Sequence, residues 1–198
     1  MTADPNHPSI PDRVKNAKTR VLRGRRAVLR PLSRDHVGER YVRWLNDSAI
    51  NRYLESRFEV HDIRSVGQFV DRSIASGDVL AFAIHLADDD TYVGNIKLGP
   101  IDAHQRMASV GFLIGEASVQ RQGLASEAVR LVTDFAFAEL ALEKLTAGAY
   151  VVNRGSIRVF DKAGWSQEAV RRKHKICDGH RIDVIEFGVL AEEWGTRS

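Results

Sequence analysis

The sequence predicts an α/β protein built around one mixed sheet. The chain has 198 residues, of which 43% are hydrophobic, and this is enough for a substantial core in a single domain. Strand-like apolar segments follow one another in the middle of the chain. Helical patterns separate the strands of its second half. This order is typical of a mixed sheet with helices packed against it.

The first half predicts a flexible tail, a strand and two helices. Residues 1–18 are polar and contain prolines, so we expect a tail there and a single domain over 19–198. AVLRPL (27–32) is predicted to be a strand. Ser33 can cap the helix that follows, in which one face collects the apolar residues Val37, Tyr41, Trp44 and Leu45. A second helical pattern covers 63–75.

The second half alternates strands with helices. Strands are predicted over 80–86, 92–99, 108–115, 144–152 and 181–190. Helices are predicted over 124–140, where an apolar stripe recurs at helical spacing, and over 153–165, which ends near Gly164.

Composition excludes some classes of protein and leaves others open. No apolar stretch approaches the about 18 residues of a membrane-spanning helix, and the single cysteine, Cys177, cannot form an internal disulfide. We therefore expect a cytoplasmic protein. Nine basic residues and no acid lie between Arg13 and Arg34, within a net charge of +3. This segment is either a solvated arm or a site for nucleic acid, an acidic membrane surface or a phosphorylated ligand, although no aromatic residues interleave with its charges.

The segment QRQGLA (120–125) joins a predicted strand directly to a predicted helix. The first N–H groups of a helix lack internal partners and lie at the positive end of its dipole. Gly123 and Ala125 have little bulk, so a diphosphate can approach the backbone there. The alternative is an ordinary turn. Neither a Walker A motif nor a dinucleotide fingerprint is present.

The order strand, Q-R-Q-G-L-A, helix, strand, N-R-G-S, helix resembles the GNAT (Gcn5-related) N-acetyltransferases over about residues 20–190. The resemblance implies a mostly antiparallel mixed sheet of about six or seven strands, flanked by about four helices and splayed at an acetyl-CoA site. It also implies that acetyl-CoA is the co-substrate and that its pyrophosphate is bound by Gln120, Arg121, Gln122, Gly123, Leu124 and Ala125.

The resemblance implies further site residues. Backbone groups of Phe112, Leu113 and Ile114 would bind the pantetheine arm, and Asn153 would hydrogen-bond to it. Ser156 would lie near the departing sulfur. Many relatives carry a tyrosine seven residues after the asparagine as general acid, but Phe160 stands there in this chain. Ser156 is therefore the candidate acid, and Tyr150 is a weaker one.

Acetyl transfer to an amine benefits from a general base, because the attacking amine must be neutral. Glu55, in the polar and aromatic segment INRYLESRF, and His104, between two strands, are the candidates. Each is alternatively a solvated surface residue. His85 lies within an apolar strand and is expected to be structural. No metal site is predicted, because the spacing of His174, Cys177 and His180 matches no full ligand set.

Two branches of the family suggest different acceptors. The chain resembles enzymes that acetylate nucleotide-linked deoxyamino sugars, and Arg52, Arg57 and the basic first strand would then meet a diphosphate. It also resembles ribosomal-protein alanine acetyltransferases. Those use a glutamate near the position of Lys175, which counts against that branch. A non-catalytic acyl-CoA sensor and a nucleic-acid-binding protein are the alternatives from other classes. A homodimer is possible, and no membrane partner is expected.

Overall fold

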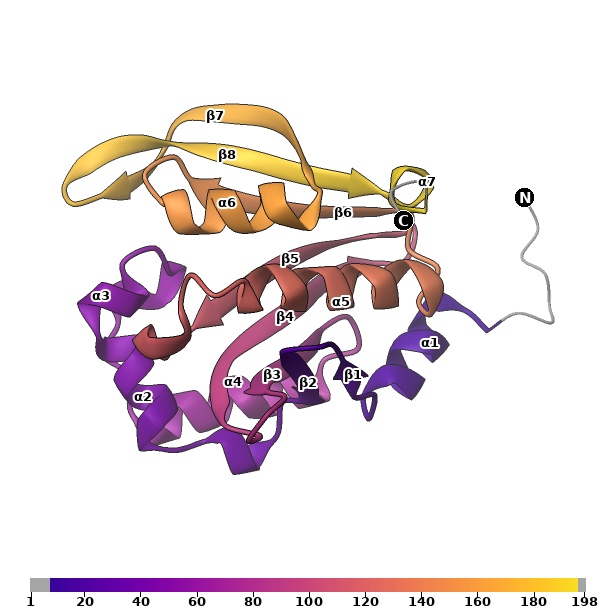
Figure 1. Cartoon of the computed structure of the whole chain (residues 1–198), viewed down its shortest axis with the longest axis horizontal. Helices are drawn as coiled ribbons and strands as arrows, with labels where there is room; N and C mark the ends of the chain where they lie inside the picture. Colours follow the sequence, from indigo (N-terminus) through magenta and orange to yellow (C-terminus); the bar gives the residue numbers. More distant parts are fainter. Residues whose placement is uncertain (1–7, 196–198) are drawn as a thin grey trace.

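The computed structural model describes residues 8–195, and within them it forms one sheet of eight strands in the order β1-β2-β3-β4-β5-β6-β8-β7 (Figure 1). All neighbours in the sheet are antiparallel except β5 and β6, which are parallel. The strands are β1 Leu22–Arg23, β2 Ala27–Pro31, β3 Leu80–Leu86, β4 Tyr92–Asp102, β5 Met107–Ile114, β6 Lys144–Tyr150, β7 Ser166–Cys177 and β8 His180–Leu190. The predicted mixed, mostly antiparallel sheet is therefore confirmed.

Helices cover both faces of this sheet. The α-helices are α1 Ile10–Ala17, α2 Glu39–Asn46, α3 Ser48–Asn51, α4 Ile63–Ala75, α5 Leu124–Ala138, α6 Arg154–Ala163 and α7 Ala191–Trp194. Three short 3₁₀ helices are η1 Arg34–His36, η2 Glu55–Phe58 and η3 Ala117–Val119. Alternation along β3 separates two cores: Phe82 packs in the cluster of α1, α5 and α6, whereas Ala83 packs in the cluster of α2 and α4. Within the described residues, no helix is both long and apolar enough to span a bilayer.

The sheet opens between β5 and β6. Their parallel pairing runs only from Met107 opposite Lys144 to Ser109 opposite Thr146. Both strands continue beyond this point, β5 to Ile114 and β6 to Tyr150. The carboxyl ends of the two central strands therefore diverge, which confirms the predicted splay and leaves the end of β5 paired with β4 but without a neighbouring strand on its β6 side.

The prediction of a flexible tail over 1–18 is wrong for the part that the structure describes. Ser9 accepts a hydrogen bond from the N–H of Asp12 (3.3 Å) and caps α1, which buries Val14 and Ala17. The ammonium of Lys18 donates to four carbonyl oxygens at the end of α4 and just beyond it, those of Ser73, Ile74, Ser76 and Val79. These bonds fasten the amino-terminal segment to the domain. Residues 1–7 lie outside the described part of the chain.

Strand β7 is absent from the prediction. Eleven of its twelve residues are exposed or half-buried, and only Cys177 is buried. It pairs with β8 on one side and forms the edge of the sheet. Because neither face of this strand is covered by a helix, its polar sequence carries no alternation that would reveal a strand.

Candidate active site

The loop 120–125 has the geometry of an anion-binding turn. Arg121 and Gly123 both have positive φ angles (63° and 84°), and α5 begins directly afterwards at Leu124. A Cβ atom added to Gly123 would meet nothing within 4 Å, so the space beside the backbone is open. The side chain of Gln120 donates to the carbonyl oxygen of Ile114 (3.2 Å) and holds the loop against the end of β5. These residues fit a diphosphate at the amino-terminal end of α5.

The basic amino-terminal segment meets this loop. Arg26 Nη1 donates to the carbonyl oxygen of Gln122 (2.5 Å), and the N–H of Arg26 donates to Glu127 in the first turn of α5 (3.0 Å). Part of the unusual charge of this segment is therefore used to position the loop. The end of β5 lies next to it, where Phe112, Leu113 and Ile114 are half-buried and beyond the last residue paired with β6.

Asn153 and Ser156 form the cap of α6. The Asn153 side chain accepts from the N–H of Ser156 (3.1 Å) and donates to its hydroxyl oxygen (2.9 Å). Phe160, where many relatives carry a tyrosine, is only 2% exposed and stacks on Phe187 at 5.3 Å between ring centroids. Phe160 therefore belongs to the hydrophobic core and carries no proton to donate.

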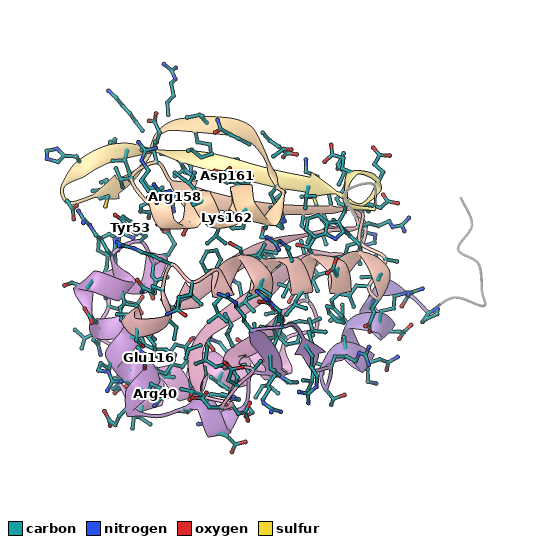
Figure 2. The ribbon with its side chains drawn as sticks, in the orientation of Figure 1. Arg40, Tyr53, Glu116, Arg158, Asp161 and Lys162 are labelled. Carbon is teal, nitrogen blue, oxygen red and sulfur yellow. The ribbon has the colours of Figure 1, made fainter. Side chains whose placement is uncertain are left out.

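Helix α6 also carries a basic face that sequence reasoning missed. Arg154, Arg158 and Lys162 recur every four residues, so they lie on one side of the helix, and all three are exposed. Figure 2 shows Arg158 and Lys162 on α6, and Arg130 of α5 donates to the carbonyl oxygen of Lys162 (2.7 Å). The four-residue spacing of these cations was the signal that could have found them.

A carboxylate and a phenol meet at the open end of the splay. Tyr150, the last residue of β6, is only 6% exposed, and its hydroxyl donates to Glu55 Oε1 (2.8 Å). Arg57 Nη1 donates to the same hydroxyl (3.1 Å). Lys175 Nζ lies 2.8 Å from Glu55 Oε2. The structure thus brings one predicted base, Glu55, next to one predicted acid, Tyr150.

These contacts set the protonation states of the pair. Burial raises the pKa of Glu55, but hydrogen bonds from Lys175 and Tyr150 outweigh it, so the net pKa lies below the ordinary 4.5. Burial and the hydrogen bond to Glu55 raise the pKa of Tyr150 above its ordinary 10.0. At neutral pH the site therefore holds an ionised carboxylate beside a neutral phenol.

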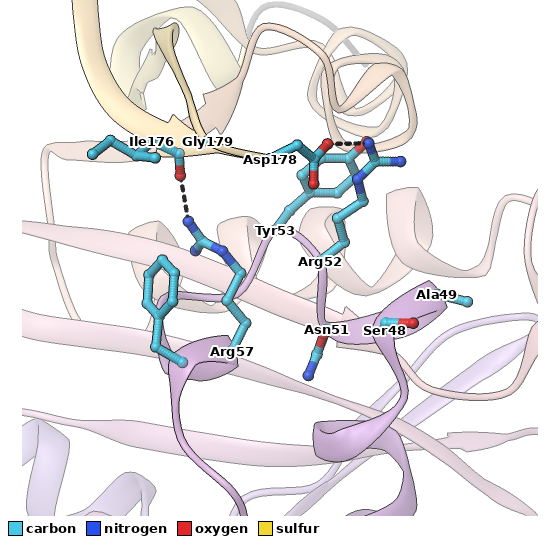
Figure 3. Close-up of a pocket in the computed structure, with 10 residues that line it drawn as sticks. Ser48, Ala49, Asn51, Arg52, Tyr53, Arg57, Ile176, Asp178 and Gly179 are labelled. Atoms are coloured by element: carbon cyan, nitrogen blue, oxygen red, sulfur yellow. Dashed lines mark hydrogen bonds and ion pairs between the residues drawn. The ribbon is translucent and has the colours of Figure 1, made fainter.

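A pocket of about 730 Å³ lies beside this pair, between α3 with η2 and the turn that joins β7 to β8 (Figure 3). Arg57 belongs to both features, because its Nη2 donates across the pocket to the carbonyl oxygen of Ile176 (2.6 Å). Arg52 forms an ion pair with Asp178 across the mouth of the pocket. The hydrogen bond from Arg52 lowers the pKa of Asp178.

Other predicted residues lie elsewhere. His104 is in the turn between β4 and β5, where its N–H donates to Asp102 (2.9 Å). The eight residues of β5, about 26 Å at ~3.3 Å per residue, separate this turn from the loop 120–125, so the structure does not bring His104 to the site. His85 is buried and hydrogen-bonds to His36. Cys177 is a buried free thiol, and residues 8–195 contain no cluster of metal-binding side chains.

Comparison with known proteins agrees with this geometry. Residues 26–166 match the family model described as "Acetyltransferase (GNAT) domain". "Probable N-acetyltransferase YjcK" of Bacillus subtilis is 38% identical over 110 residues, which are 55% of this chain and 60% of that protein. The match thus spans less than two thirds of that relative. Spermidine N(1)-acetyltransferase of Escherichia coli is 30% identical over 168 residues, 84% of this chain and 87% of that protein.

A solved structure shares the fold. Spermidine N-acetyltransferase from Vibrio cholerae, determined in complex with CoA and spermine, superimposes with a TM-score of 0.77. It is 20% identical, and the match covers 86% of this chain and 99% of that one. At this level of identity the likeness concerns the fold.

Proposed function

The chain belongs to the GNAT acetyltransferase family, and from this premise we propose that it transfers an acetyl group from acetyl-CoA to a primary amine of a small molecule by direct attack. One observation carries the proposal: the pair Glu55 and Tyr150 lies at the open end of the β5–β6 splay. The carboxyl end of β5 on the other side of that opening leads into the diphosphate-type loop 120–125. In this proposal, acetyl-CoA binding and proton transfer take place at the same opening of the sheet.

Three groups of residues are proposed to hold acetyl-CoA. The N–H groups at the start of α5, with Gly123 and Arg121, would receive the pyrophosphate, and the basic face of α6 would add positive charge for its phosphates. The backbone groups of Phe112, Leu113 and Ile114 that are directed away from β4 would accept the pantetheine arm. When bound, acetyl-CoA supplies an activated acyl carbon in its thioester.

Glu55 is proposed as the base and Ser156 as the acid. A carbon–nitrogen bond forms while the carbon–sulfur bond breaks, so the amine loses a proton and the thiolate gains one. The ionised carboxylate of Glu55 is placed to accept the first, directly or through water. The hydroxyl oxygen of Ser156 receives a hydrogen bond from Asn153, and within residues 8–195 no acceptor is assigned to its own hydrogen, which is therefore free to move to the sulfur. Tyr150 holds the carboxylate in place.

The pocket favours an acceptor that carries negative charge. Arg52 and Arg57 line it, and a polycation such as spermidine would meet like charge there. Two aromatic rings, Tyr53 and the 75%-exposed Phe58, also line the pocket and offer surfaces on which a nucleobase can stack. We therefore keep the nucleotide-linked deoxyamino sugar as the proposed acceptor, with a peptide amino terminus as the alternative. A cytoplasmic location stays a prediction.

Product mass with a panel of acceptors tests this proposal. The protein and acetyl-CoA are incubated with UDP- and dTDP-linked 4-amino sugars, alanine-starting peptides and spermidine. Acetylation of a nucleotide-linked amino sugar supports the proposal, and acetylation of the peptides alone selects the alternative. Tight acetyl-CoA binding without any product favours the sensor interpretation. Failure to bind acetyl-CoA would overturn the assignment of the loop 120–125.

Variants of the predicted residues assign the roles. Ser156→Ala is expected to lower kcat about 10- to 100-fold with little change in the KM for the acceptor, because a proton donor is lost. His104→Ala tests the remaining candidate base, and from its position we expect near wild-type activity. A large loss in His104→Ala would move the base to that residue.

A further inference from the structure

An ion pair between Arg52 and Asp178 bridges two sides of the acceptor pocket. Arg52 follows the end of α3, and Asp178 lies in the turn between β7 and β8, so their contact joins two segments 126 residues apart in sequence (Figure 3). Both side chains are more than half exposed, at 52% for Arg52 and 59% for Asp178. An exposed ion pair of this kind contributes little to stability and can exchange its partners readily.

The two arginines of the pocket differ in how firmly they are held. Arg57 is half-buried, and its guanidinium donates to the carbonyl oxygens of Leu54 and Ile176 and to the Tyr150 hydroxyl, so it is occupied by the protein itself. Arg52 donates to the exposed carboxylate of Asp178, and its guanidinium also lies over the Tyr53 ring, 5.6 Å from the ring centroid. Its guanidinium is therefore the one that a ligand can take over.

The backbone conformation of the β7–β8 turn holds the carboxylate of Asp178 next to Arg52, where it would compete with a bound anion for the guanidinium. Asp178 and Gly179 both have positive φ angles, 49° and 78°, and they connect Cys177 to His180 as a two-residue hairpin turn. Asp-Gly is a favoured sequence for such a turn. The carboxylate thus sits at the tip of the hairpin because of the turn, and it faces the guanidinium across the pocket mouth.

The surrounding charge is positive. Residues 171–181 contain five Lys and Arg residues and a single acid, Asp178. Of these cations, Lys175 is paired with Glu55 and Arg171 with Glu186. The net positive charge at the tip attracts anions toward the pocket. In the free protein, the carboxylate of Asp178 is the anion that contacts Arg52.

We propose that Asp178 occupies the place of the acceptor's phosphate, and that a phosphate-bearing amine binds by displacing this carboxylate from Arg52. Arg52 is then the specificity residue for the acceptor. Asp178 contacts Arg52 through one carboxylate oxygen, whereas a phosphate can place two oxygens on the fork of the guanidinium. This inference rests on the proposed acetyltransferase function and names the chemistry of its acceptor.

Binding of UDP to the CoA-saturated protein tests the inference without requiring turnover. CoA occupies its own phosphate sites, so UDP reports on the acceptor pocket, and calorimetry gives its Kd. Arg52→Gln is expected to weaken UDP binding about 10-fold or more, and Asp178→Asn to tighten it about 3-fold or more. Asparagine tolerates positive φ, so this variant removes the charge and keeps the turn. Arg64→Gln, at an exposed position of α4, is the matched control and leaves the Kd of UDP unchanged.

Unchanged UDP binding in Arg52→Gln, or no gain in Asp178→Asn, would overturn the inference. Kinetics give a second readout: Asp178→Asn lowers the KM for a UDP-linked 4-amino sugar and leaves that for the free amino sugar as it was. Equal effects on both acceptors would count against displacement. If no acceptor turns over, the proposed function fails, while the UDP measurement still decides whether Arg52 and Asp178 form an anion site.

Discussion

The hydroxyl of Tyr150 donates a 2.8 Å hydrogen bond to the carboxylate of Glu55, across 95 residues of sequence. This bond ties the end of the central strand β6 to the short helix η2, which otherwise packs at the rim of the pocket. It also orients the carboxylate, because the phenol donates and the carboxylate accepts. Lys175, on the second oxygen of the carboxylate, lowers the pKa of Glu55.

Replacement of Glu55 by Gln removes the proposed base and keeps the shape of the side chain. We expect kcat to fall about 100-fold or more, since general base catalysis typically contributes 10²–10⁴-fold, while the Kd of acetyl-CoA stays the same. Steady-state kinetics and calorimetry measure the two quantities. Glu59→Gln, an exposed glutamate after the same short helix, serves as the control. Activity within about threefold of wild type in Glu55→Gln would remove Glu55 from the mechanism.

Lys175→Met should raise the pKa of Glu55. The hydrogen bond from Lys175 is the first of the contacts that lower this pKa, and its charge lowers the pKa further, so their removal should raise it. A ¹³C NMR titration of the Glu55 carboxyl group measures the change directly, free of the ionisation of the acceptor amine. Lys97→Met, at an exposed position of the central strand β4, should leave the titration as it is. An unchanged or lowered pKa in Lys175→Met would show that the ion pair does not control the carboxylate.

Gly123→Ala separates backbone strain from ligand contact in the loop. A left-handed non-glycine residue costs about 1–2 kcal/mol, which corresponds to a Tm loss of about 2–8 °C for a chain of this size. The added methyl group also enters the open space beside the loop, so acetyl-CoA should bind about 10-fold more weakly. Thermal unfolding and calorimetry give both numbers.

Gly123→Asn completes this comparison, because asparagine tolerates positive φ. It should recover part of the lost Tm and none of the lost affinity. Gly38→Ala is the control, since Gly38 is extended and a Cβ there meets nothing within 4 Å. If acetyl-CoA bound equally well to all three variants, the loop would not be its pyrophosphate site.

Local sequence patterns predicted the parts of this molecule whose structure depends on residues close together in the sequence. The loop 120–125 and α5 follow from a glycine before an amphipathic helix, and the splay follows from the family resemblance. Lys175 and Asp178 could not be assigned this way. Lys175 lies on an edge strand without apolar alternation, and Asp178 lies in the turn after it. Their proposed roles depend on contacts with Glu55 and Arg52, which are more than a hundred residues away in sequence. Long-range pairing of polar residues leaves no periodic signal.

A contact between half-buried His36 and buried His85 predicts a loss of stability in mild acid. The N–H of Ser33 donates to His36 Nδ1 (3.1 Å), so neutral His36 carries its hydrogen on Nε2, which lies 3.1 Å from Nε2 of His85. His85 Nδ1 in turn lies 2.8 Å from the carbonyl oxygen of Asp90 and donates to it. Neutral His36 thus has a partner at each ring nitrogen, and a proton added to its Nδ1 would face the N–H of Ser33.

The pKa of His36 is accordingly lowered, first by burial and then by His85, while Asp35 and Arg30 act in opposite directions on it. Because the folded state then binds fewer protons than the unfolded state, stability is complete above the ordinary pKa of 6.5 and declines as the pH falls below it. We expect the Tm to drop between pH 7.5 and 5.5, a range above the titration of ordinary carboxylates. The Tm of His36→Asn should fall much less over this pH range. The Tm of His104→Asn, a change in an exposed turn, should fall as in the wild type. Equal pH dependence in both variants would show that His36 titrates normally in the folded protein.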